Sequence, residues 1–307
     1  MWADTKRSWL HIVVRGGVVL PHINRRVVVS VVLAVATTAI FHWVPALHVS
    51  LSPTPFILIG LPLGVFLGFR NTSSYDRYWE GRRLWGQLVN SARSLTRQLL
   101  TLVDGEPAAE VEVFRRHAVH LLIEYVHALR HHLRDQTPIP RLERELGADL
   151  AERIRSEENV PVALLQELGV ELARARRRGW LDPLHVPLLE GQLVSLTDSQ
   201  GGCERIKSTP LPFSYTVLMH RIVAVYCLLL PFGLADSIGW MTPLVVAFVS
   251  YAFYGLDAIG DEIEQPFGRD VNDLALSSIA RTVEINLRRR IGEEPPPPFR
   301  PRNGQLI

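Results

Sequence analysis

The chain has 307 residues, of which 47% are apolar and 21% carry a charge, and its formal net charge is +2. So small an imbalance gives no sign of nucleic-acid binding, and we expect none. The two cysteines, Cys203 and Cys227, are far apart, which excludes a disulfide framework. These totals alone would suit a soluble protein, so the distribution of the charges decides the class.

Two long tracts are almost free of charge. Val27 to Phe69 contains no Lys, Arg, Asp or Glu over 43 residues, and Ile222 to Leu256 contains only Asp236. A helix crosses the hydrocarbon core with about 20 apolar residues, so each tract has room for two crossings and a short hairpin. Neither tract has the polar stripe of a soluble amphipathic helix. The sequence therefore predicts an all-α integral membrane protein with four transmembrane helices per subunit.

The basic residues indicate the orientation in the membrane. All 33 Lys and Arg lie outside the two expected hairpin loops, Trp43–Pro55 and Leu234–Pro243. By the positive-inside rule these loops face away from the cytoplasm, so both termini are expected on the cytoplasmic side. The first tract is too long for the apolar region of a signal peptide, and we expect it to be retained as a multi-pass anchor in the cell inner membrane.

The predicted segments follow one another without an internal repeat or a separating linker, so one structural unit is expected. In chain order they are a basic cytoplasmic arm (1–26), transmembrane helices 1 and 2 (27–69), a cytoplasmic helical body (70–212), transmembrane helices 3 and 4 (213–256), a cytoplasmic C-terminal segment (257–291) and a Pro-rich tail (292–307). The four spans are expected near Val27–Leu47, Pro55–Phe69, Tyr215–Ala235 and Thr242–Leu256. The second is expected to continue as an amphipathic helix to Leu102.

The second span carries two sets of residues that recur at every fourth position. They are Gly60, Gly64 and Gly68 on one face, and Leu61, Val65 and Phe69 on an adjacent face. Small residues at this spacing let membrane helices approach closely. If several copies surrounded an axis, the apolar set would form stacked rings that gate by dewetting. An ordinary membrane helix with a glycine packing seam explains the same period.

Two polar clusters could bind a metal. The first shares one helix face and consists of His117, His120, Glu124, His127 and His131. It contains the Glu-x-x-His pair of di-metal bundles, and a membrane-bound metal-dependent enzyme is our alternative function. A half-buried polar flank of an apolar stripe explains the same spacing. The second cluster is Asp257, Asp261, Glu262 and Glu264, which could bind a hard cation or cap helices and pair with arginines.

Motifs of the common enzyme classes are absent from the sequence. It has no nucleophile elbow, P-loop, dinucleotide fingerprint or Cys-x-x-Cys pair. We therefore expect a protein that is not an enzyme. A scaffold with a sealed core is a third possibility.

Three stretches together resemble the bestrophin family, in particular its bacterial branch. They are Phe66-Leu-Gly-Phe-Arg-Asn71 with Tyr75-Asp-Arg-Tyr-Trp-Glu-Gly-Arg-Arg-Leu-Trp85, Cys203-Glu-Arg-Ile-Lys-Ser-Thr-Pro-Leu-Pro-Phe-Ser-Tyr215, and Tyr254-Gly-Leu-Asp-Ala-Ile-Gly-Asp-Glu-Ile-Glu-Gln-Pro-Phe-Gly268. Their order and the apolar tracts between them extend the resemblance over roughly residues 10 to 290. It implies a homopentameric channel around a central pore, which passively conducts small monovalent ions, chloride or sodium.

The resemblance also implies roles for particular residues. It places the pore neck at Leu61, Val65 and Phe69, the apolar face already noted. A cytosolic aperture is implied just before the helix that leads to Cys203, at Leu184, Val186 or Pro187. The expected partners are four further copies of the chain, the lipid bilayer and the permeating ions.

Animal bestrophins bind calcium through an acidic cluster after Pro-Phe-Gly. Asp270 and Asp273 match two of its acidic positions and are the candidate metal ligands here, but Arg269 replaces the first acidic residue. A cation beside the site and a missing carboxylate weaken calcium binding strongly. We therefore expect no required cofactor, and the apolar neck does not decide between anions and cations.

Overall fold

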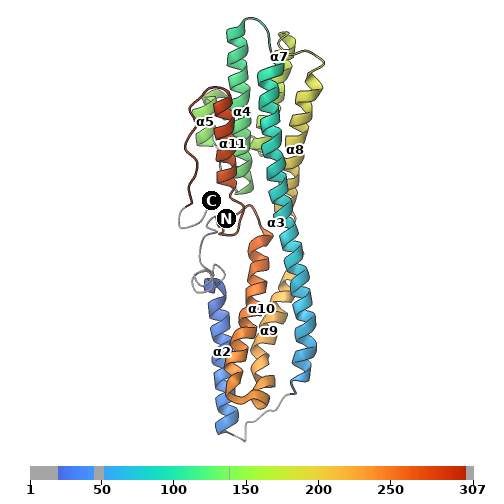
Figure 1. Ribbon diagram of the computed structural model, residues 1–307, viewed down its shortest axis with the longest axis vertical. Helices are drawn as coiled ribbons and strands as arrows, with labels where there is room; N and C mark the ends of the chain where they lie inside the picture. Colours follow the sequence, from blue (N-terminus) through green and yellow to red (C-terminus); the bar gives the residue numbers. More distant parts are fainter. Residues whose placement is uncertain (1–19, 45–51, 138, 302–307) are drawn as a thin grey trace. The chain divides into compact units, whose positions relative to one another are not determined.

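The computed structural model describes residues 20–44, 52–137 and 139–301 (Figure 1). The helices in these residues are α2 (Leu20–Trp43), α3 (Thr54–Leu102), α4 (Ala108–Leu133), α5 (Ile139–Leu146), α6 (Ala148–Arg155), α7 (Val160–Arg177), α8 (Val186–Ser208), α9 (Phe213–Ile238), the 3-10 turn η2 (Gly239–Met241), α10 (Thr242–Glu264) and α11 (Leu276–Arg290). No strand occurs among them, so the predicted all-helical class is confirmed for the described part of the chain.

The helices extend beyond the apolar spans that were expected. Helix α2 begins at Leu20, inside the predicted basic arm, of which 1–19 lie outside the described residues. Helix α10 continues past the predicted end of its span to Glu264. A charged residue ends an apolar span without ending a helix, because Arg and Asp side chains leave the backbone hydrogen bonds intact. The predicted continuation of the second span to Leu102 is confirmed, since α3 runs unbroken through Pro62.

The chain groups into two compact units, and it passes from one to the other within α3 after Tyr78, between Thr209 and Pro210, and between Pro266 and Phe267. We call the first unit the bundle; it comprises Asp4–Tyr78 and Pro210–Pro266. We call the second unit the body; its main segments are Trp79–Thr209 and Phe267–Ile307.

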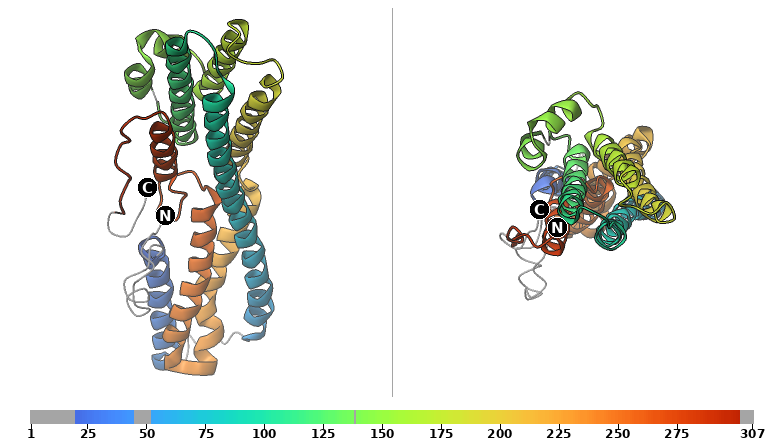
Figure 2. Two further views of the ribbon diagram at one scale, coloured as in Figure 1. Left: turned by 45° about the horizontal axis from the view of Figure 1, so that its top comes forward. Right: turned by 90° about the horizontal axis from the view of Figure 1, so that it is seen from above.

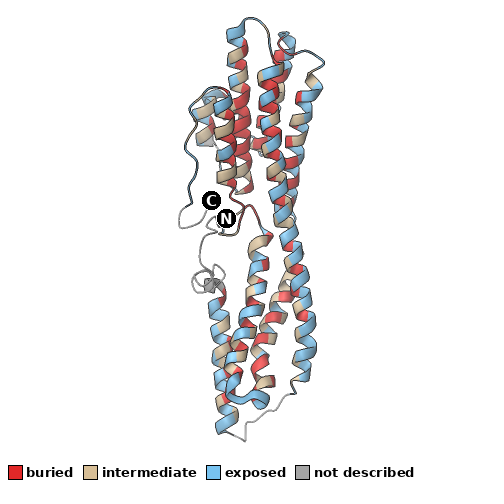
Figure 3. Cartoon of the chain, in the orientation of Figure 1, coloured by how far each residue is buried: buried red, intermediate tan, exposed pale blue. Residues whose placement is uncertain are grey.

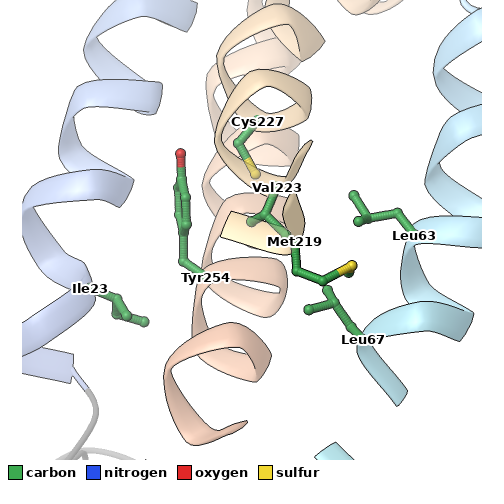
Figure 4. Close-up of a cluster of buried hydrophobic side chains, with 7 residues drawn as sticks. All are labelled: Ile23, Leu63, Leu67, Met219, Val223, Cys227 and Tyr254. Carbon is green, nitrogen blue, oxygen red and sulfur yellow. The ribbon is translucent and has the colours of Figure 1, made fainter. Parts of the chain in front are cut away.

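In the bundle, α2, α9 and α10 pack side by side (Figures 1 and 2). A core cluster joins them to the first part of α3, and its members are Ile23, Leu63, Leu67, Met219, Val223, Cys227 and Tyr254 (Figure 4). The core is narrow, and much of the bundle's apolar surface is exposed (Figure 3). Trp43 and Trp240 lie edge to face, with ring centroids 5.9 Å apart, at the end where α2 stops and η2 turns, as in an interfacial aromatic belt.

Among the described residues, three helical segments are long and apolar enough to cross a membrane. They are Ile23–Trp43, Thr54–Leu102 and Phe213–Glu264, the last of which contains both α9 and α10. An outward apolar surface on this scale would be unfavourable in water and is suited to lipid.

The body is organised around α4, which packs against α7, α8 and α11. The apolar stripe predicted for this segment is buried throughout, at Phe114, Ala118, Leu121, Leu122, Tyr125, Ala128 and Leu129. The Tyr125 hydroxyl donates to the carbonyl of Leu196 on α8 at 3.0 Å. Helix α7 is capped by Asn159, whose side chain accepts from the amide of Val162. The body is thus a conventional helical core built around the apolar stripe of α4.

Candidate pore-lining face

The predicted neck residues lie on a face of α3 that no described helix of the bundle covers. Leu61, Val65 and Phe69 are 75%, 51% and 64% exposed. Leu63 and Leu67, which face the other way on the same helix, are buried in the bundle core (Figure 4). Helix α3 therefore has two apolar faces, of which a single subunit covers only one.

The glycine set packs within the subunit at one position only. A Cβ at Gly60 would lie 2.6 Å from the hydroxyl oxygen of Tyr226 on α9, so this glycine is required for a close approach. A Cβ at Gly64 or Gly68 would meet no described atom within 4 Å. The close-packed seam of the prediction is thus formed at Gly60, while Gly64 and Gly68 leave space beside the neck face.

A buried ion-pair network begins at the residue after Phe69. The side chain of Arg70 is 0% exposed, and its Nη1 donates to Asp257 Oδ1 at 2.7 Å. Its Nη2 pairs with Asp261, one turn further along α10. A Cβ at Gly260, between these two carboxylates, would lie 2.5 Å from Asn71 Oδ1, so glycine allows α10 to lie against α3 here. The network therefore ties α3 to α10 just beyond Phe69.

The role of Arg70 was not predicted from the sequence, although a signal for it was present. Arg70 is the first charge after the first apolar tract, and Asp257 is the first charge after the second. Two spans that end at the same membrane surface bring such residues to the same depth. The interpretation of the acidic cluster as arginine partners is confirmed for Asp257 and Asp261.

One group of side chains in the described residues has ligand atoms close enough to hold a metal: His220, Asp257 and Asp261. His220 Nδ1 lies 2.7 Å from Asp257 Oδ2. The guanidinium of Arg70 already pairs with both carboxylates and supplies the positive charge that a metal would bring. We therefore interpret this group as an ion-pair network.

Asp270 and Asp273 do not come together with a third ligand in the part of the chain that the structure describes. Their observed interaction is a local turn, in which the Asp270 amide donates to Asp273 Oδ2 at 2.7 Å.

The side chains on the histidine face of α4 pair with other side chains of the body. Arg141 lies 2.7 Å from Glu124, His127 lies 3.0 Å from Glu284, and His120 lies 2.8 Å from Glu293. Among the described residues this face contributes no three-ligand metal group. These pairings favour the polar flank over the metalloenzyme, although Glu124 and His127 are fully buried rather than half-buried.

Burial controls the protonation of this face. It lowers the pKa of His127 to about 4 even though Glu284 accepts from that imidazole. Burial and the neighbouring Arg130 lower the pKa of His131 to about 4. Burial alone would raise the pKa of Glu284, but hydrogen bonds from His127 and Arg141 outweigh it and hold the pKa well below the usual range. His127 is thus a neutral donor to an ionised Glu284.

We expect the body to lose stability as the pH falls from about 6.5 to about 4. In this window the unfolded chain takes up protons at His127 and His131 while the folded chain does not, so each contributes a slope of up to about 1.4 kcal/mol per pH unit. The measurement is Tm against pH for the parent, His127→Gln and the matched control His117→Gln. The slope should be shallower in His127→Gln alone, and equal slopes in all three would contradict the assignment.

The region matched to the aperture is an exposed turn at the start of α8. Leu184 is 81% exposed, and its amide donates to Asp182 Oδ1 at 2.8 Å. Val186 and Pro187 form the first turn of α8, which leads to the buried Cys203. Burial raises the pKa of the Cys203 thiol to about 12, so this cysteine is a packing residue without thiolate chemistry.

Long apolar helical segments with exposed apolar faces define a helical membrane protein. The chain matches the family model described as Bacterial/Fungal Bestrophin protein over residues 1–289, and it belongs to that family.

Its relatives include the voltage-dependent anion channel-forming protein RSc3414 of Ralstonia nicotianae, 48% identical over 90% of each chain. The voltage-dependent anion channel-forming protein YneE of Escherichia coli K12 is 36% identical over 92% of this chain and 91% of its own. A crystal structure of a bacterial bestrophin homologue from Klebsiella pneumoniae is similar with a TM-score of 0.84 at 35% identity, covering 89% of this chain and all of the other.

Proposed function

We propose that this chain is the subunit of a homopentameric channel of the cell inner membrane, which passively conducts small monovalent anions. The observation that carries the proposal is the exposed apolar face of Leu61, Val65 and Phe69, opposite the packed face of the same helix. Five such faces around one axis would form stacked apolar rings, which gate by wetting and dewetting. The space beside Gly64 and Gly68 would admit the neighbouring subunit's helix.

Four crossings per subunit, by α2, the first part of α3, α9 and α10, would place both termini in the cytoplasm. Leu184, with Val186 and Pro187 beside it, would then form a second apolar constriction on the cytoplasmic side. No metal or other cofactor is needed for passive conduction through such a path.

The preference for anions is supported by the charges that continue along α3 and by the names of the relatives. Arg82, Arg83, Arg93 and Arg97 are exposed on this helix and have no ion-pair partner among the described residues. Arg83 lies two heptads beyond Phe69 and so shares its helix face. Uncompensated positive charge along a conduit raises the local concentration of anions. Both relatives reported above carry names as anion channel-forming proteins.

The test is ion flux from liposomes that contain the purified protein, with chloride and sodium gradients imposed separately. We expect chloride flux well above that of protein-free liposomes and a smaller sodium flux. Sodium flux without chloride flux would contradict the selectivity, and flux of neither ion would contradict the channel. Native mass spectrometry of the same sample should give a pentamer.

A further inference from the structure

A groove in the bundle combines basic and apolar side chains at the end where α2 and α9 begin. It has a volume of about 570 Å³, and its lining residues are Arg25, Arg26, Val29, His220, Arg221, Ala224, Leu228 and Tyr254. The first three belong to α2, the next four to α9 and the last to α10. The groove is distinct from the neck face of α3 and has no part in the conduction path proposed above.

The positive charge of the groove is largely uncompensated. Arg25 and Arg221 are exposed and have no ion-pair partner in the residues that the structure describes. Arg26 reaches Asp257 only at 3.7 Å, with its side chain 53% exposed. Asp257 is buried and already bound by Arg70 and His220, so it offers little charge to the groove. The groove mouth therefore attracts an anion.

The wall of the groove changes from basic to apolar along both helices in the same direction. Val29 lies one turn beyond Arg25 on α2, and Ala224 and Leu228 lie one and two turns beyond Arg221 on α9. Beyond the groove, α2 continues without a charge to Trp43, and α9 carries only Asp236 before it ends at Ile238. An anion alone would use only the mouth, whereas a molecule with a charged head and an apolar chain would use the whole groove.

We propose that this groove binds a phospholipid with an anionic headgroup from the cytoplasmic leaflet. The phosphate lies among Arg25, Arg26 and Arg221, and an acyl chain runs along Val29, Ala224 and Leu228. Basic pockets between transmembrane helices on the cytoplasmic side are suited to anionic lipids, since that leaflet carries them. The proposal depends on the membrane orientation proposed above but not on ion conduction, so failure of the flux assay would leave it standing.

The test is native mass spectrometry of delipidated, full-length protein titrated with phosphatidylglycerol or phosphatidylcholine. Arg25→Gln with Arg221→Gln removes the two unpaired charges, and Ala224→Trp fills the apolar part of the groove. The matched control is Arg176→Gln with Arg177→Gln, two exposed arginines at the end of α7 in the body. Each basic residue near an anionic lipid strengthens binding about fivefold, so the double variant should bind phosphatidylglycerol about 25-fold more weakly.

We expect the parent to bind phosphatidylglycerol more tightly than phosphatidylcholine. The groove variants should weaken binding of phosphatidylglycerol, and the control should leave it unchanged. Equal phosphatidylglycerol binding by the double variant and the parent would overturn the proposal. In a second experiment, inorganic phosphate competes with phosphatidylglycerol for the groove. If it displaces phosphatidylglycerol at equal concentration and Ala224→Trp has no effect, the site is one for a free anion and the lipid assignment is wrong.

Discussion

Replacing Val65 and Phe69 together by alanine is expected to raise single-channel conductance several-fold. Both side chains are exposed on one face of α3, so their truncation removes no contact from the bundle core. In the proposed pentamer it would widen two stacked apolar rings and lower the dewetting barrier. The measurement is conductance in planar bilayers at fixed chloride concentration.

The matched control for this prediction is Ile59→Ala with Phe66→Ala. These residues are also exposed and apolar on α3, at 50% and 51%, but lie about a quarter turn or more from the neck face. Conductance should stay near that of the parent. An increase in the control and none in the neck variant would mean that another face of α3 lines the pore.

Arg70→Gln should destabilise the protein more than any surface substitution. The substitution removes the main cationic partner of the buried Asp257 and the ion pair between Arg70 and Asp261. Removing one partner of a buried ion pair typically costs about 3–5 kcal/mol, because the remaining charge stays buried. We expect a much lower Tm in detergent and a lower yield of assembled protein.

Two further variants separate this effect from a general loss of folding. Arg70→Gln with Asp257→Asn removes both charges and should recover part of the lost Tm, since no bare carboxylate is then buried at Asp257. Arg205→Gln breaks the exposed pair with Glu80 and should cost less than about 1 kcal/mol. If Arg70→Gln matched Arg205→Gln in Tm, the network would not hold α3 to α10.

The positions of the helices and the surfaces suited to lipid could be predicted from the local pattern of apolar and charged residues. The uninterrupted run to Leu102, the buried stripe of α4 and the apolar spans of α9 and α10 were all anticipated, with errors mainly at the helix ends. These features depend on neighbours one or two turns away, which a single sequence contains. The helix ends were misplaced because charge marks the membrane boundary and hydrogen bonding marks the end of a helix.

The proposed pore face illustrates the limit of this reasoning. The period of four placed Leu61, Val65 and Phe69 on one face, but it applied equally to the glycines beside them. Contacts with Tyr226, Met219 and Val223 show which face of α3 the subunit covers. The proposed neck residues pack against no helix of the described chain, which a periodic pattern cannot reveal, since it contains no information about the other helices.

Sequence alone was thus sufficient for the helical class, the apolar spans and a face of interest on α3. The tertiary structure was needed to see that Arg70 binds Asp257, 187 residues further along the chain. It was also needed to show that the histidine face of α4, a possible metal site from the sequence, instead pairs His127 with Glu284 and Glu124 with Arg141. The physical reason is that a charge takes its role from the partner that folding brings to it, and that partner is set by the packing of whole helices.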